Sequence, residues 1–226
     1  QTSVIQSSKE WDFRSCTGGA SDGLSIPDSR GSGPDAMFIW NAYCCPTASN
    51  LWCPTESPSD FNGVALEGDS NLNSHAEDYL IFQGGVNWGA WGMSIGGMSF
   101  EVLVRVQNYN DWSTIFHFQQ VENQHEIFLR TYAYSSGFRF GVIQDPLEYA
   151  YIESSNNGFF DLEKWTHCVI TISVTGVYTV YRNGAQFGNT VTSGVVPLLV
   201  DRPSGQLGKS LNYPGVGGAQ QYNLRG

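Results

Sequence analysis

Acidic side chains are the residues of this sequence whose type and spacing come closest to catalytic chemistry. Two carboxylates on one strand face can hydrolyse a glycosidic bond, one as the acid and the other as the base or nucleophile. Glu67 and Asp69 have that spacing, but the glycine between them indicates a turn, and the next residue in phase, Asn71, is not acidic. Glu148 and Glu153 are five residues apart and therefore face opposite sides of a strand. Neither pair predicts catalysis, and we expect that the chain is not an enzyme.

Histidines and nucleophile motifs add no further chemistry. The four histidines lack the spacing of a metal-binding motif, and they lie at His75, His117, His125 and His167. The sequence contains no nucleophile elbow, phosphate-binding loop or dinucleotide fingerprint. It therefore predicts no nucleophilic chemistry and no required cofactor.

Aromatic side chains indicate binding instead. Trp88 and Trp91 lie in a glycine-rich segment, residues 87–92, and an indole ring on a loop can stack on a sugar or on a partner side chain. Trp112, on a later predicted loop, completes this candidate ligand-binding set, and packing in the core or at its rim is the alternative. Four tyrosines alternate on neighbouring predicted strands and could line one sheet face, with cross-strand packing as the alternative: Tyr132, Tyr134, Tyr149 and Tyr151.

Four of the five cysteines lie in the first quarter of the chain, among proline, serine, asparagine and glycine. This placement predicts two disulfides and an oxidising, extracellular compartment. A bond between adjacent Cys44 and Cys45 would be strained, so two pairings remain open: Cys16–Cys44 with Cys45–Cys53, or Cys16–Cys45 with Cys44–Cys53. Cys168 lies on an apolar strand face, and we expect a buried free thiol there, with an intermolecular bridge as the alternative.

The elements that must position these residues are β-strands. Residues 164–186 contain two apolar, β-branched runs, and the Asn183-Gly184 pair predicts a tight turn after the second. The first run has a period of two, which predicts a buried face made of Thr166, Cys168, Ile170 and Ile172. Short strands are predicted near residues 37–40, 64–67, 78–83, 98–107, 113–119, 126–134, 137–144, 148–153, 164–174, 177–182, 185–189 and 205–209.

This strand series predicts an all-β fold with two packed antiparallel sheets. The length of 226 residues suits one domain, which we place at residues 10–226, after a polar arm at residues 1–9. A cysteine-rich insertion on the rim of the sandwich is expected at about residues 41–62, because this segment combines three cysteines with three prolines.

The same residues resemble a known family. Residues 164–186 read KWTHCVITISVTGVYTVYRNGAQ, similar to a motif of laminin-G-like and pentraxin-like jelly rolls in the concanavalin-A-like lectin and glucanase superfamily. Six further pieces resemble family strands or turns in the family's order: residues 11–13, 28–31, 63–66, 100–104, 110–113 and 207–210. The resemblance implies a jelly roll whose final strand is missing after residues 222–226, so that the chain is a fragment or a partner supplies the strand.

Calcium is a further implication of the resemblance, because lectin-like and laminin-G-like members often hold it on one rim. The stretch after the predicted strand at 205–209 lacks the acidic run of a pentraxin double site. Solvated acids are the expectation for the loop carboxylates, with a single calcium ion as the alternative, and the candidate ligands are Asp69, Glu77, Asp78 and Asp111.

Charge and hydropathy limit the partners. The chain has 21 acidic and 11 basic side chains and no Lys/Arg cluster, which argues against nucleic acid. No segment is long and apolar enough to span a bilayer. We therefore expect a secreted, non-catalytic laminin-G-like module for adhesion or structural assembly within a larger extracellular or filament-forming protein. Its partner would be an extracellular protein, a glycan or a second copy, and the alternative is a carbohydrate-binding, lectin-like module.

Overall fold

The computed structural model describes residues 97–208 except 108, 110–111, 122–123, 134 and 156–157. It also describes Met93 and the backbone of five strands nearer the N-terminus. These five strands are β1 (Ser25–Ile26), β2 (Ala36–Ile39), β3 (Ala42–Cys45), β4 (Gly63–Leu66) and β5 (Tyr79–Phe82).

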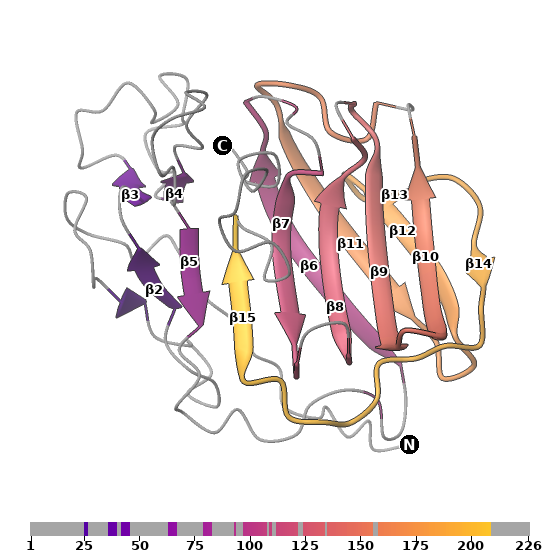
Figure 1. Ribbon diagram of the computed structural model, residues 1–226. Coiled ribbons are helices and arrows are strands. Elements are labelled where there is room, and N and C mark those ends of the chain that lie inside the picture. The colour runs from indigo at the N-terminus through magenta and orange to yellow at the C-terminus, as the bar shows by residue number, and fades with distance from the viewer. Residues whose placement is uncertain are drawn as a thin grey trace, which may run out of the picture.

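Two antiparallel sheets form the layers of a sandwich, with the larger sheet in front in Figure 1. The front sheet has the strand order β1-β2-β5-β15-β7-β8-β9-β10. Its later strands are β7 (Thr114–Gln119), β8 (Glu126–Thr131), β9 (Phe138–Asp145), β10 (Glu148–Ser154) and β15 (Ser204–Leu207). The back sheet has the order β13-β12-β11-β6, and β14 also pairs with β12. Its strands are β6 (Met98–Arg105), β11 (Trp165–Ile172), β12 (Val177–Arg182), β13 (Ala185–Gln186) and β14 (Val191–Thr192).

This architecture confirms the predicted two-sheet antiparallel fold. In β11 burial alternates along the strand as its sequence period predicted, with Cys168 and Ile170 inside. Three strands were not predicted. The two-residue strands β1 and β14 are too short to show an alternation, and β3 lies in the segment expected to be an irregular insertion. Residues of β3 form a strand because they pair with β4. The pairing runs from Ala42 with Leu66 to Cys45 with Gly63.

The core lies between β7–β10 in front and β6, β11 and β12 behind. Phe140 on β9 is fully buried and joins the layers, because its ring lies 5.4 Å from Phe100 of β6 and 6.1 Å from Tyr178 of β12, between ring centroids. The Tyr178 hydroxyl donates a hydrogen bond to the Val195 carbonyl at 2.8 Å, so its one polar atom is satisfied.

Cys168 is a free thiol that is fully buried in this core. Burial raises its pKa to about 12, so the group stays protonated at neutral pH. Predicted disulfides would join side chains outside the described part of the chain, those of Cys16, Cys44, Cys45 and Cys53. The polar arm and the expected first and last strands also lie outside it. Within the described part, no helix is long and apolar enough to cross a membrane.

Candidate binding face

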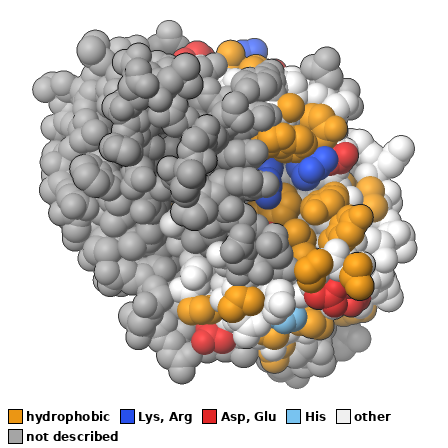
Figure 2. Space-filling view, in the orientation of Figure 1, with side chains coloured by type: hydrophobic (Ala, Val, Ile, Leu, Met, Phe, Trp, Pro, Cys, Tyr) orange, Lys and Arg blue, Asp and Glu red, His pale blue; other side chains and the backbone are white. Residues whose placement is uncertain are grey.

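The outer face of β8, β9 and β10 carries arginine and aromatic side chains in contact with one another. Alternation produces this face: Leu129, Phe140 and Ile152 point into the core, so their neighbours along each strand point outward. We define the arginine–aromatic face by these outward residues and two from adjoining loops: Trp112, Phe128, Arg130, Tyr132, Arg139, Tyr149, Tyr151 and Glu153. In Figure 2, blue side chains lie among orange ones on the described part of this side of the molecule.

Arg139 is at the centre of the face. Its guanidinium carbon lies 4.3 Å from the centroid of the Trp112 ring, and 5.0 and 5.4 Å from those of Tyr151 and Tyr132. These rings come from three elements: the loop before β7, strand β10 and the residue after β8. The Arg139 Nε donates a hydrogen bond to the Glu153 carboxylate, and the arginine side chain is 26% exposed. One accessible cation is therefore surrounded by aromatic rings.

A second arginine lies beside the first. Arg130 on β8 pairs in register with Arg139 on β9, and Arg139 in turn pairs with Glu153 on β10. The Arg130 guanidinium lies over the Phe128 ring, 3.7 Å from its centroid. Phe128 itself is buried against the backbone of the next strand, where Gly141 has no side chain to obstruct it. Arg130 therefore lies over an aromatic ring whose position is fixed by packing.

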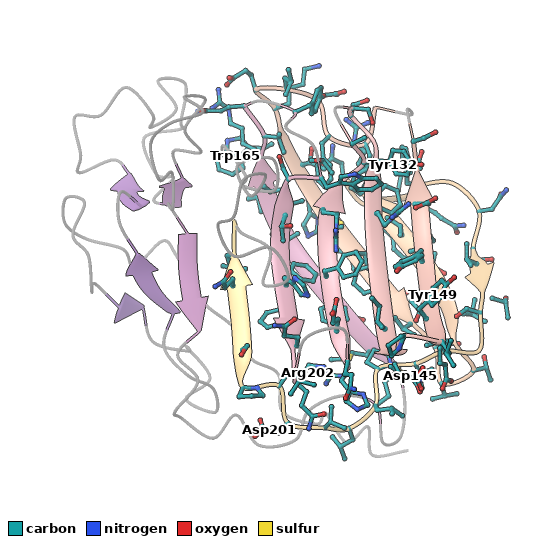
Figure 3. All side chains as sticks on the ribbon, in the orientation of Figure 1. Tyr132, Asp145, Tyr149, Trp165, Asp201 and Arg202 are labelled. Carbon is teal, nitrogen blue, oxygen red and sulfur yellow. The ribbon has the colours of Figure 1, made fainter. Side chains whose placement is uncertain are left out.

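Two tyrosines extend the face along β10. The Tyr149 and Tyr151 rings lie 5.1 Å apart, and Tyr149 is 53% exposed. Burial raises the pKa of the Tyr151 phenol, and the charges of Arg139 and Arg130 partly oppose this. Figure 3 shows Tyr132 near one end of the sheet and Tyr149 towards the other. The aromatic surface is thus long enough to contact an extended ligand rather than a single small group.

Three carboxylates near this face are held by the protein. Glu126 is buried beside His117, with 3.3 Å between its Oε2 and the imidazole Nε2, and burial lowers the His117 pKa. Asp145 accepts the backbone N–H groups of Leu147 and Glu148 at 2.7 and 3.0 Å in the turn between β9 and β10. Glu153 is bound by Arg139.

The spacing of Glu126 and Glu153 also argues against their acting as a hydrolytic pair. Glu126 pairs with Ile143, which pairs with Tyr149, and this row lies four residues from Glu153 on β10. Four residues of strand correspond to about 13 Å. Glycosidases place their two carboxyl groups roughly 5 to 9.5 Å apart. Glu126 and Glu153 therefore do not form such a pair.

The sequence candidates are placed only in part. Trp112 joins the arginine–aromatic face, whereas Trp88 and Trp91 lie outside the described residues. The calcium candidates Asp69, Glu77, Asp78 and Asp111 also lie outside them. Among the residues that the structure describes, no three His, Cys, Asp or Glu side chains are grouped to hold a metal ion.

Arg130 and Arg139 are candidate binding residues that the sequence did not indicate to us. The signal was the run Phe138-Arg139-Phe140, where a charge alternates with core residues and must face outward. The turn at Asp145–Glu148 fixes the hairpin register that sets Arg139 opposite Glu153. The contact between Trp112 and Arg139 had no such sequence signal. It depends on the backbone of Trp112 itself, a loop residue with a positive φ of 54°.

Solved structures with similar folds include the crystal structure of the botulinum neurotoxin serotype G binding domain. It has a TM-score of 0.54 and 14% identity over 82% of this chain and 42% of that chain. The binding domain of botulinum neurotoxin DC, in complex with rat synaptotagmin II, has a TM-score of 0.53 and 14% identity over 81% and 42%. At this identity the likeness shows the fold alone, and this chain spans less than half the length of either.

Curated proteins provide no match to the chain. Residues 78–220, more than half of the sequence, match the family model Laminin_G_3, described as the concanavalin A-like lectin/glucanases superfamily. The match covers the strands β5 to β15, which include all strands of the outer face described above. As its strand motifs predicted, the chain belongs to this laminin-G-like family of the concanavalin A-like lectin/glucanases superfamily.

Proposed function

We propose that this chain is a non-catalytic, extracellular carbohydrate-binding module and that the arginine–aromatic face is its binding surface. The observation that carries the proposal is the group of three aromatic rings, from Trp112, Tyr132 and Tyr151, around the guanidinium of Arg139. This arrangement combines flat apolar surfaces with a fixed hydrogen-bond donor.

Such a combination matches the chemistry of a saccharide. The C–H faces of a sugar ring pack on aromatic rings, while its hydroxyl oxygens accept hydrogen bonds from a guanidinium. Tyr149 and Tyr151 lie along β10 and provide further ring surface beside the arginine. Because Tyr149 and Tyr151 stand on one strand of a packed sheet, little of that part of the face must be ordered when a ligand binds.

The state of the carboxylates favours binding over hydrolysis. Glu126 is buried, Asp145 caps a turn and Glu153 is engaged by Arg139. None is therefore poised as a free acid or base. The family includes lectins by its description, and the similar neurotoxin structures are described as binding domains. Both support a binding role, and an extracellular setting agrees with the cysteine-rich N-terminal quarter.

The test compares two tryptophans on opposite sides of the sandwich. Trp112 belongs to the arginine–aromatic face, whereas Trp165 begins β11 in the back sheet (Figure 3). The wild-type chain and the variants Trp112→Ala and Trp165→Ala would be applied to an immobilised library of neutral and acidic oligosaccharides, with thermal unfolding as the check of folding.

We expect wild type and Trp165→Ala to bind the same glycans and Trp112→Ala to lose at least tenfold in affinity. Tyr149→Ala, at a more exposed position of the face, provides a second variant if Trp112→Ala is poorly folded. Absence of glycan binding by the wild type, or equal losses in the Trp112 and Trp165 variants, would contradict the proposal.

A second candidate function, adhesion or self-assembly, is favoured by an apolar rim at one end of the sandwich. We define the apolar rim as Val121, Leu147, Leu198 and Leu199, which are 51%, 94%, 38% and 48% exposed. Val121 lies in the turn after β7, and Leu147 lies in the turn between β9 and β10. The leucines at 198 and 199 lie in a loop that Gln144 holds by a hydrogen bond to the Val196 carbonyl at 2.9 Å.

Exposed apolar side chains gathered on loops are typical of protein contact sites. Sedimentation equilibrium over a hundredfold range of concentration would measure self-association through this rim. We expect Leu147→Ser to weaken any association without reducing stability, because its side chain is 94% exposed. A wild-type chain that stays monomeric over the whole range would exclude self-assembly through the rim.

A further inference from the structure

The arginine–aromatic face contains a charge arrangement that a neutral sugar would not require. Arg130 and Arg139 are paired in register on neighbouring antiparallel strands, so their like charges lie side by side. Like charges directly opposite each other in a sheet are destabilising. The arrangement occurs in a chain whose formal net charge is −10. Two guanidinium groups therefore lie side by side on one face of a protein whose net charge is negative.

Arg139 also retains hydrogen-bonding capacity. Its Nε donates to Glu153, and the two terminal guanidinium nitrogens have no hydrogen-bond partner among the described residues. Three aromatic rings position the guanidinium without using those donors. A planar guanidinium with free terminal N–H groups fits an anionic oxygen pair, such as a carboxylate, better than it fits a single hydroxyl.

Glu153 shows how an anion sits at this position. Its carboxylate contacts Arg139 from the adjoining strand, and its side chain is 37% exposed. An exposed ion pair of this kind contributes little to stability, so a ligand can displace or share it at small cost. The carboxylate of Glu153 is thus an internal counterpart of an anionic ligand group.

We propose that the face is specific for anionic saccharides, with a carboxylate or sulfate group bound by Arg139 and with Glu153 as an internal competitor. The inference rests on the proposed function and deepens it. The sugar ring that carries the anionic group would lie against Trp112 and Tyr151, which flank Arg139. Because the proposed contact joins a guanidinium to an anionic group, salt should weaken binding.

The test uses a hexuronic-acid oligosaccharide, its carboxyl-reduced neutral counterpart and a sulfated neutral oligosaccharide as probes in isothermal titration calorimetry. The variants are Arg139→Gln, Arg139→Lys and Glu153→Gln. Glu148→Gln is the matched control, because it makes the same charge change on the same strand, outside the arginine–aromatic face.

We expect the wild type to bind the hexuronate at least tenfold more tightly than the reduced form. Arg139→Gln should remove that difference, and Arg139→Lys should retain part of it because the charge remains but the planar fork is lost. Glu153→Gln should tighten hexuronate binding severalfold, whereas Glu148→Gln should leave it unchanged. Preference for the sulfated probe over its neutral form would also support the anionic class and would identify sulfate as the group.

Different failures would overturn different claims. Equal affinity for the hexuronate and its reduced form, with no gain from sulfate, would overturn the anionic specificity and leave carbohydrate binding supported. Absence of binding by all three probes, together with a negative glycan library, would overturn the proposed function and this inference with it. Weaker hexuronate binding by Glu153→Gln would show that Glu153 positions Arg139, and would overturn its role as a competitor.

Discussion

The Phe128 ring lies across the backbone of Gly141 on the neighbouring strand, so closely that a β-carbon at Gly141 would come within 2.3 Å of the Phe128 Cζ. This contact fixes the position of the Phe128 ring relative to the sheet. The Arg130 guanidinium lies over the same ring, 3.7 Å from its centroid. The Tyr151 ring is 6.0 Å from it, between centroids. One missing side chain therefore determines how three members of the binding face are arranged.

Gly141→Ala should displace the Phe128 ring and disturb the face. We expect a loss of about 1 to 3 kcal/mol in unfolding free energy from overpacking, together with weaker glycan binding. Urea unfolding and calorimetric titration would measure the two effects. In the double variant Gly141→Ala/Phe128→Leu the ring is absent. Gly141→Ala should therefore reduce the unfolding free energy less in the Phe128→Leu background than it does in the wild type. Strict additivity of the two losses would contradict the proposed contact.

Tyr178→Phe should reveal an alkaline limit to stability. Burial raises the Tyr178 pKa from 10.0 to about 12, so the folded state favours the protonated phenol. The contribution of the Tyr178 phenol to the unfolding free energy is fully present below pH 10 and is lost as the pH rises towards 12. The variant lacks the group and should cost about 1 kcal/mol near pH 8, where it loses the bond to Val195. The difference between the two proteins should shrink above pH 10 in urea unfolding.

Cys168 titrates in both proteins and therefore cancels in the Tyr178 comparison. A constant difference in stability from pH 8 to pH 11 would contradict the assignment of the shifted phenol. Loss of the difference only below pH 8 would contradict it as well, because a raised tyrosine pKa acts on the alkaline side.

The Cys168 thiol should resist alkylation in the folded protein. It is fully buried and its pKa is raised to about 12, so both access and thiolate population are low. Peptide mapping after iodoacetamide treatment should find Cys168 unmodified in native buffer and carbamidomethylated in denaturing urea. Modification in native buffer, or a mixed disulfide at Cys168, would contradict its placement in the core.

The turn after β12 should depend on the side chain of Asn183. This residue has a φ of 50°, and its Oδ1 accepts the His167 N–H at 2.9 Å while its own N–H donates to the His167 carbonyl at 2.8 Å. Asn183→Ala should cost about 1 to 2 kcal/mol, because it loses a hydrogen bond and the tolerance for a left-handed backbone. Asn183→Asp keeps both and should stay within about 0.5 kcal/mol of wild type in thermal unfolding.

Local patterns were sufficient to predict the strands that build this sandwich. The alternation of β11 predicted which side chains are buried, and the Asn183-Gly184 pair predicted the turn that follows β12. These features depend on neighbours in the sequence, so they can be read without a structure. The strand β3 was missed because its stability depends on pairing with β4, about twenty residues away.

The binding face was predictable only in part. Tyr149 and Tyr151 alternate on one strand, so their common face follows from the period of two. The meeting of Trp112 with Arg139 does not follow from any local pattern, since it joins a loop to a strand that lies two strands later. Side chains brought together across elements require the tertiary structure.

The most direct test of the binding face is a ¹H–¹⁵N correlation experiment on the labelled chain, titrated with the hexuronate oligosaccharide and with its carboxyl-reduced form. We predict chemical-shift changes at the backbone amides of Arg139, Gly141 and Tyr151 and at the Trp112 indole, with no change at Trp165. Changes confined to the apolar rim or to the back sheet would contradict the account.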